Sequence, residues 1–262
     1  MTSPTSVPPN ASSPIESPPS ATPPRTRAAL WEDFIDILYA PSQVFDRRRD
    51  GRFGLAWLIG FALLVGLVLS IRPLLQPYFE GLASMQIDMM RRSGQKIPEE
   101  MLTKIASGTE RFGFVGLPMA MFFFWLLTGC ALWLVAKFFD ARPSFSQAMM
   151  ISTYANIPRW ILGVVTTAVI ALLSSPDRLR ASAASIYLSP AVLVSQDTQP
   201  IAFALLSRIE PFTLWVTVLL GIGLSVVCRI PRSRAFAAAA ALWVIGTIFA
   251  LLSVLRQQAA MG

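Results

Sequence analysis

Long apolar runs along this chain alternate with short stretches rich in arginine. Residues 211–228 carry no charge, the six-residue turn 229–234 contains three arginines and a proline, and residues 235–255 are again uncharged. An α-helix needs about 20 apolar residues, at a rise of about 1.5 Å each, to cross the hydrocarbon core of a bilayer. The two runs and the basic turn between them therefore predict a helical hairpin in a membrane.

Similar apolar runs recur toward the N-terminus. We predict membrane spans at residues 53–75, 112–139, 148–174, 211–228 and 235–255. Hydrophobic residues make up 54% of the chain and charged residues only 14%, whereas soluble domains carry about 25% charged residues. The predicted fold class is thus an all-α integral membrane protein, with residues 28–262 forming a five-span helical bundle.

Amphipathic stretches flank the first predicted span. In residues 28–45 the apolar side chains recur at helical spacing, with three acids between them. This pattern predicts a short helix on the membrane surface, which Pro41 ends. The apolar residues are Trp31, Phe34, Ile35, Leu38 and Tyr39, and the acids are Glu32, Asp33 and Asp36. Residues 78–111 carry charges of both signs and a partial helical rhythm interrupted at Gly94 and Pro98. We expect two amphipathic helices there, on the outer membrane surface.

Residues 1–27 differ from the rest of the chain. They are rich in Pro, Ser, Thr and Ala and contain no apolar run. A segment of this composition buries too little surface to offset its ordering entropy, so we predict a disordered tail. A cleaved signal peptide would need a continuous apolar region, which this tail lacks. A proline-rich docking motif is the alternative interpretation.

The net charge of +7 comes from arginines near the ends of the predicted spans. In a membrane protein such a surplus determines orientation, so it does not indicate a nucleic-acid partner. Its distribution predicts a cytoplasmic N-terminus and, with five spans, an outside C-terminus in a plasma (inner) membrane. These arginines are candidate contacts with anionic lipids, and the alternative interpretation, that they only fix the topology, is the simpler one. They are Arg47, Arg48, Arg49, Arg52, Arg229, Arg232 and Arg234.

The third predicted span contains polar residues at its centre, namely Asn156, Pro158 and Arg159. Proline is expected to kink the helix, and an arginine at the bilayer centre costs about 2.5–3.5 kcal/mol on insertion scales. Either the span begins near Ile157 and Arg159 reaches the interface, or Arg159 faces the bundle and is neutralised by carbonyls freed at the kink. A broken span at this point is also the alternative functional hypothesis, because it would line the anion path of a small transporter or channel.

An enzymatic function is not predicted. Histidine is absent, and no Asp or Glu lies inside a predicted span. A serine nucleophile needs a base, and a catalytic metal needs His or carboxylate ligands. Cys130 and Cys228 lie far apart in apolar runs, which favours buried, unreactive thiols. We therefore expect no catalytic, cofactor-binding or metal-binding residues.

Three segments, taken in order, resemble conserved stretches of bacterial Yip1-domain proteins. They are Tyr39-Ala-Pro-Ser-Gln-Val-Phe45, then Pro143-Ser-Phe-Ser-Gln-Ala148 with Tyr154-Ala-Asn-Ile-Pro158, and then Ile209-Glu-Pro-Phe-Thr-Leu-Trp-Val-Thr-Val-Leu-Leu-Gly-Ile-Gly-Leu224 with the basic turn Arg229–Arg234 and Ala235 after it. The resemblance implies a five-span membrane fold with a cytosolic N-terminus. The eukaryotic branch of that family is associated with vesicle trafficking and Rab-type GTPases, but its D-L-Y-G-P motif is absent here.

The function predicted from all of this is a non-enzymatic membrane protein that organises membranes or binds partners. Its expected partners are membrane lipids and other membrane proteins or further copies of itself.

Overall fold

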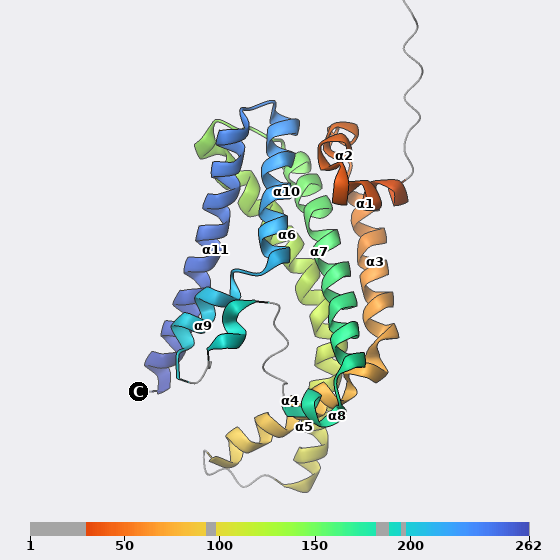
Figure 1. Ribbon diagram of the computed structural model, residues 1–262, viewed down its shortest axis with the longest axis vertical. Helices are drawn as coiled ribbons and strands as arrows, with labels where there is room; N and C mark the ends of the chain where they lie inside the picture. Colours follow the sequence, from red (N-terminus) through yellow and green to blue (C-terminus); the bar gives the residue numbers. More distant parts are fainter. Residues whose placement is uncertain (1–29, 93–97, 182–188, 195–197, 262) are drawn as a thin grey trace, which may run out of the picture.

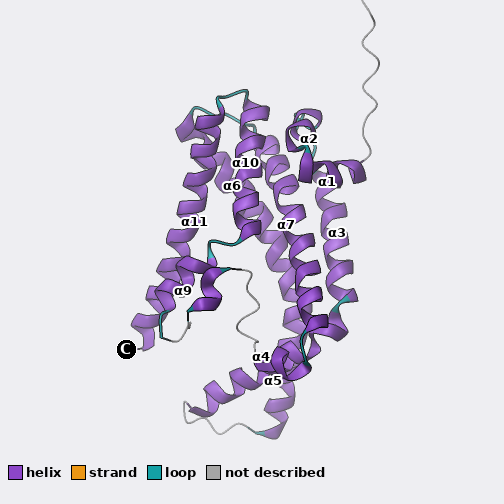
Figure 2. Ribbon diagram, in the orientation of Figure 1, coloured by secondary structure: helices purple, strands orange, loops and turns teal. Residues whose placement is uncertain are grey.

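The computed structural model describes residues 30–92, 98–181, 189–194 and 198–261, so the tail predicted at residues 1–27 lies outside the described part of the chain. The described residues form helices joined by turns and contain no strand (Figure 2). Figure 1 shows the long helices side by side, with short helices at both ends of the bundle.

The helices follow one another in a simple order. The first half of the chain contains α1 (Leu30–Tyr39), α2 (Pro41–Arg47), α3 (Gly54–Ser70), α4 (Arg72–Arg92), α5 (Glu99–Arg111), η1 (Phe112–Gly116), α6 (Leu117–Ala136) and η2 (Lys137–Phe139). The second half contains α7 (Phe145–Leu173), α8 (Pro176–Ala181), η3 (Pro190–Leu193), α9 (Pro200–Ser207), α10 (Pro211–Cys228) and α11 (Arg232–Met261).

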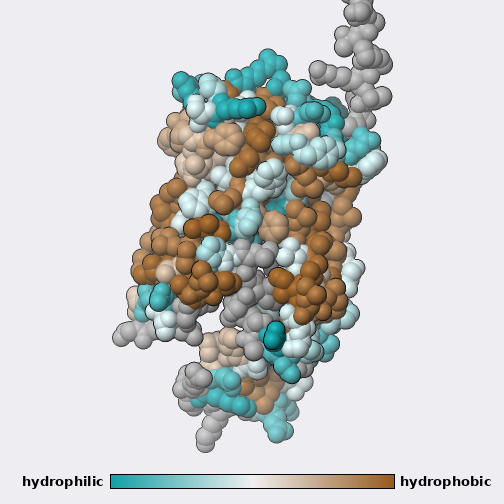
Figure 3. All heavy atoms as spheres, in the orientation of Figure 1, coloured by the Kyte–Doolittle hydropathy of each residue, from teal (hydrophilic) through white to brown (hydrophobic). Residues whose placement is uncertain are grey.

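Four helical stretches in the described residues are long and apolar enough to cross a membrane, namely Glu99–Phe139, Phe145–Leu173, Pro211–Cys228 and Arg232–Arg256. A fifth candidate is the pair formed by α3 and α4, which passes the same test only when the two helices are taken together and is bent by 75°. On the face shown in Figure 3, brown apolar atoms predominate over the middle of the molecule, and teal polar atoms gather toward its two ends. These features confirm the predicted all-α membrane bundle.

Local sequence signals explain where several helices begin and end. Ser144 caps α7, since its hydroxyl accepts a hydrogen bond from the Gln147 amide while the Gln147 side chain accepts one from the Ser144 amide. Pro41 ends α1 and is also the first residue of α2, a helix that the sequence did not predict. Arg229 ends α10 in the left-handed conformation, with φ of 53°.

The ends of the helices bring the basic turns together. Arg234, at the start of α11, contacts Asp140 in the turn before α7, with 2.9 Å between Nη1 and Oδ2. Arg49, in the turn after α2, donates a hydrogen bond to the Val226 carbonyl near the end of α10. The turns after α2, α6 and α10 therefore lie at the same end of the bundle, beside α1 and α2 (Figure 1).

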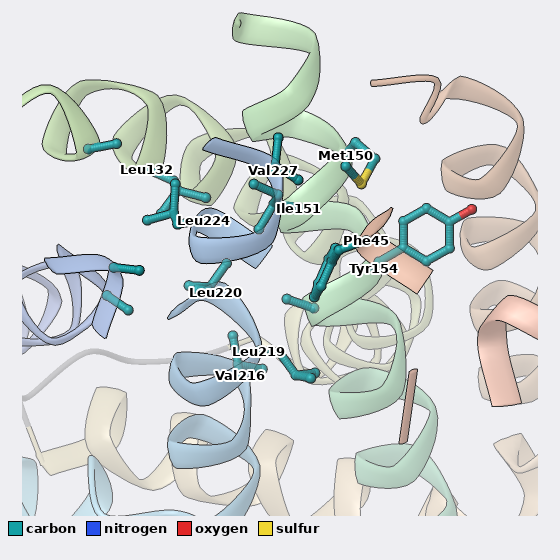
Figure 4. Close-up of a cluster of buried hydrophobic side chains, with 14 of the residues drawn as sticks. Phe45, Leu132, Met150, Ile151, Tyr154, Val216, Leu219, Leu220, Leu224 and Val227 are labelled. Carbon is teal, nitrogen blue, oxygen red and sulfur yellow. The ribbon is translucent and has the colours of Figure 1, made fainter. Parts of the chain in front are cut away.

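The core at this end joins helices that are far apart in the sequence. Phe45 of α2, Ile151 and Tyr154 of α7, and Leu220 and Leu224 of α10 belong to one cluster of buried side chains (Figure 4). Burial of a large apolar side chain contributes about 1.5–3 kcal/mol, so this cluster fixes α2 against the bundle. A second cluster, which includes Leu64, Trp125 and Ile157, packs α3 against α6 and α7.

Candidate functional site

The first candidate site fastens α1 to the bundle through a buried carboxylate. Asp33 of α1 is fully buried. Its Oδ1 lies 2.9 Å from Nη2 of Arg47, and its Oδ2 accepts a hydrogen bond of 2.6 Å from Nε of Arg48. The hydroxyl of Tyr154, on α7, lies 3.5 Å from the same Oδ2. One carboxylate thus joins α1, α2 and α7.

The opposite face of α1 is apolar and open. Trp31 is 63% exposed, Ile35 49% and Leu38 40%, although all three lie on the same ten-residue helix as the buried Asp33. Figure 1 shows α1 lying across the end of the bundle rather than along it. A helix in this position, with large apolar side chains on its outer face, has the form of an interfacial helix.

The other acid of this region, Asp36, is partly buried on α1, with 18% of its side chain exposed. It accepts a 2.6 Å hydrogen bond from the Tyr39 hydroxyl and a shorter one from Arg47. The Tyr39 hydroxyl, and after it Arg47, hold the pKa of the Asp36 carboxyl below its ordinary value. Asp36 is therefore charged at neutral pH and strengthens the contact between α1 and α2.

The arginines predicted to face anionic lipids have mixed roles. Arg47 and Arg48 are committed to Asp33, and Arg49 and Arg52 contact nearby acids as well, at 3.3 Å from Asp46 and 3.0 Å from Asp50 respectively. In the second basic turn Arg234 contacts Asp140, whereas Arg229 and Arg232 are exposed and form no ion pair with the described part of the chain. Arg229 and Arg232 are thus the members of the predicted set that are exposed and carry no ion pair with a described residue.

The second candidate site lies inside the bundle around Arg159. Its side chain is 17% exposed, and Nη2 lies 3.2 Å from Oε2 of Glu210, the residue that precedes α10. The Thr213 hydroxyl donates a 2.8 Å hydrogen bond to the same oxygen. The guanidinium also stacks on Trp160, with 5.0 Å from Cζ to the ring centre. Arg159 thus faces the bundle, as one of the two predicted placements has it, but a carboxylate neutralises it rather than freed carbonyls.

The other two predicted residues of this site are in α7. The helix runs without interruption through Pro158, so the broken span proposed for a transporter is not found at this position. Asn156 is fully buried, and its Nδ2 donates a 2.9 Å hydrogen bond to the Ser152 carbonyl. Its Oδ1 has no hydrogen-bond partner among the described residues.

A cavity of about 330 Å³ opens beside these residues, between α6, α7, α10 and α11. Asn156 and Arg159 line it together with Arg208, a cation that the sequence analysis did not single out. A second cavity of about 200 Å³, between α3, α4, α6 and α7, has Glu210 in its wall. The ion pair of Arg159 and Glu210 therefore lies between the two cavities.

Comparison with known protein families decides the relationship of this chain. The model of the Yip1 domain matches residues 35–254, which is most of the sequence. The chain belongs to the Yip1 family. No curated protein and no solved structure matches it.

The three segments that resemble Yip1 proteins meet in the core of this Yip1 domain. Phe45 comes from the first segment, Ile151 lies between the two parts of the second, and Gly223 comes from the third. A Cβ atom on Gly223 would lie 2.6 Å from Cγ2 of Ile151 and 3.2 Å from Cζ of Phe45. A side chain at position 223 would force Ile151 or Phe45, both labelled in Figure 4, to shift. Residues in or beside all three segments thus pack together where α2, α7 and α10 meet.

Proposed function

We propose that this Yip1-family membrane protein is non-enzymatic and organises the membrane through α1, which inserts its apolar face into the headgroup region of one leaflet. The observation that carries the proposal is the division of α1 into two faces. Asp33 on one face is fully buried by two arginines, whereas Trp31 on the other face is 63% exposed.

The ion pairs make α1 a rigid part of the bundle. A free amphipathic helix can leave the interface, but α1 can leave only if Asp33 gives up both arginines. Removing one partner of a buried ion pair costs about 3–5 kcal/mol, because it leaves an unpaired charge. The inserted face is thus held at a fixed depth relative to the spans, where it displaces lipid headgroups in one leaflet.

The orientation that we propose puts α1 on the cytoplasmic side of a bacterial inner membrane. Support comes from the three basic turns, which lie at the same end as α1, and from the positive-inside rule. Residues 28–262 then form the membrane domain, with the bent α3–α4 pair as the first of five spans and the C-terminus outside. Arg229 and Arg232 are proposed to contact the anionic lipids of the inner leaflet, and other membrane proteins or further copies of this chain are the proposed protein partners.

Spin labels on the full-length protein in lipid vesicles test the depth of α1. Cys130 and Cys228 are first replaced by serine, and a label is then attached through Ile35→Cys. We expect oxygen to reach this label far better than a water-soluble nickel complex does. The matched control is a label attached through Gln43→Cys, at an exposed position of α2, where the nickel complex should dominate.

Two outcomes would count against the proposal. A label at position 35 that is as accessible to nickel as one at position 43 would exclude insertion of α1. Vesicles whose size and lipid packing do not change when Trp31, Ile35 and Leu38 are all replaced by serine would exclude a membrane-organising role. Purification from native membranes in mild detergent would identify any protein partner.

A further inference from the structure

We infer that the cavity between α6, α7, α10 and α11 binds the phosphate headgroup of an anionic lipid. The cavity contains two guanidinium groups, those of Arg159 and Arg208. Glu210 is paired with Arg159, at 3.2 Å, whereas Arg208 forms no ion pair with a residue that the structure describes. One positive charge is therefore left without a matching carboxylate in the described residues around the cavity.

The partners of Arg208 show why an anion is needed. Its Nε lies 3.3 Å from the Thr247 hydroxyl, a neutral group that already donates a hydrogen bond to the Trp243 carbonyl. Its Nη2 lies over Gly246, where a Cβ atom would come within 3.1 Å of it. A cation in such an apolar bundle is unfavourable unless it is paired. A phosphate suits the planar fork of arginine, which can donate two parallel hydrogen bonds to it.

Two further polar atoms of the cavity have no partner among the described residues. One is Oδ1 of the fully buried Asn156, which can only accept a hydrogen bond, and the other is Nε1 of Trp243, which can only donate one. Buried polar atoms without partners are rare in proteins. A headgroup that carries hydroxyls beside its phosphate, as glycerol does, would satisfy both atoms.

The mouth of the cavity indicates that the anion belongs to a lipid. Leu127 of α6 and Phe249 of α11 both line the cavity, and they are 66% and 68% exposed on the apolar surface of the bundle. An occupant can therefore enter sideways from the bilayer. The volume of about 330 Å³ is at the lower end of ligand pockets. It holds a headgroup and the start of an acyl chain, and the rest of the chain stays among the surrounding lipids.

This inference does not depend on the role proposed for α1, which contributes no residue to the cavity lining. The test uses full-length protein exchanged into detergent with phosphatidylglycerol or phosphatidylcholine, and native mass spectrometry counts the lipids that stay bound. We expect phosphatidylglycerol to be retained, and Arg208→Gln to weaken its binding by about tenfold, as expected for the loss of one charge-assisted contact. Arg91→Gln is the matched control, since Arg91 is an exposed arginine outside both the cavity and the basic turns, and it should change nothing.

A second variant covers the case in which Arg208→Gln fails to fold. Leu242→Trp keeps both arginines but fills the apolar part of the cavity, and it should also release phosphatidylglycerol. The inference is overturned if either folded variant retains as much phosphatidylglycerol as the parent protein does. A competition experiment with inorganic phosphate distinguishes a lipid from a free anion. If it binds as tightly as the lipid and displaces it, the site takes a free anion and the assignment to a lipid is wrong.

Discussion

Nη2 of Arg159 lies 3.2 Å from Oε2 of Glu210, and this contact joins the middle of α7 to the beginning of α10. Both side chains are largely shielded from solvent, at 17% and 29% exposure. The pair explains how an arginine is accommodated at the centre of a long apolar helix, and it leads to the first prediction.

Arg159→Gln should lower the stability of the protein because it removes the ion pair of the Glu210 carboxylate and leaves Thr213 as its hydrogen-bond partner among the described residues. We expect a loss of about 2–3 kcal/mol, somewhat less than for a fully buried pair because both groups are partly exposed. Thermal unfolding of the purified protein in detergent measures the effect. The double variant Arg159→Gln, Glu210→Gln should recover most of the loss, and a double variant no more stable than the single one would show that the pair itself is unimportant.

Asp33→Asn should free α1 from the bundle. The substitution leaves Arg47 and Arg48 without their shared buried carboxylate, at a cost of about 3 kcal/mol. A spin label at position 35 should become mobile, whereas the parent protein should hold it rigidly. Asp36→Asn, at a less deeply buried acid of the same helix, is the control and should have a smaller effect. Equal mobility in both variants would argue against a special role for Asp33.

The contact of α1 with α2 should also depend on pH through Asp36. The Tyr39 hydroxyl, and then Arg47, hold the pKa of this carboxyl below its ordinary value of 3.8. A lowered pKa gives stability that is present above the ordinary value and is lost as the pH falls through the folded-state pKa. Tyr39→Phe removes the main cause, so label mobility at position 35 should rise at a higher pH than in the parent. Mobility measured from about pH 6 down to about pH 3 covers the relevant range. Identical profiles would refute the role assigned to Tyr39.

Gly223→Ala should destabilise the core where α2, α7 and α10 meet. The added methyl would lie 2.6 Å from Ile151, which forces a shift in the packed core at a cost of about 1–3 kcal/mol. Gly66→Ala is the control, because a Cβ atom there has nothing within 4 Å. Alanine favours a helix over glycine at both positions by about 1 kcal/mol, so the difference between the two variants isolates the packing. Unfolding temperatures in detergent should fall for the first variant and rise slightly for the second.

Much of the fold could be predicted from the sequence because local signals define its long helices. The bounds of α10 agree with the predicted span 211–228, since a proline begins the apolar run and an arginine in the left-handed conformation follows it. The first span was less predictable. A continuous helix was expected over residues 53–75, but α3 ends at Ser70 and α4 begins at Arg72 after a bend of 75°. Pro73 allows a helix to begin there, and the angle is set by packing rather than by local sequence.

The candidate sites were harder to predict because their partners are far apart in the chain. Arg159 and Asn156 stood out as polar residues in an apolar run, but Glu210 and Arg208 lie about 50 residues later, outside any predicted span. Asp33 was predicted on the solvated face of a surface helix. It is buried instead, because Arg47 and Arg48 fold back on it from the following helix. Such pairings are tertiary contacts, and no local pattern reports them.

The contact between Asp33 and Tyr154 has a mechanical consequence. Tyr154 lies on α7, which continues without a break to Leu173 at the far end of the bundle, where α4 and α8 pack together. An α-helix is stiff along its axis. If bending of one leaflet tilted α1, α7 would therefore move as a unit and carry the displacement to its other end. Curvature on one side of the bilayer would then move the helices that lie on the other side.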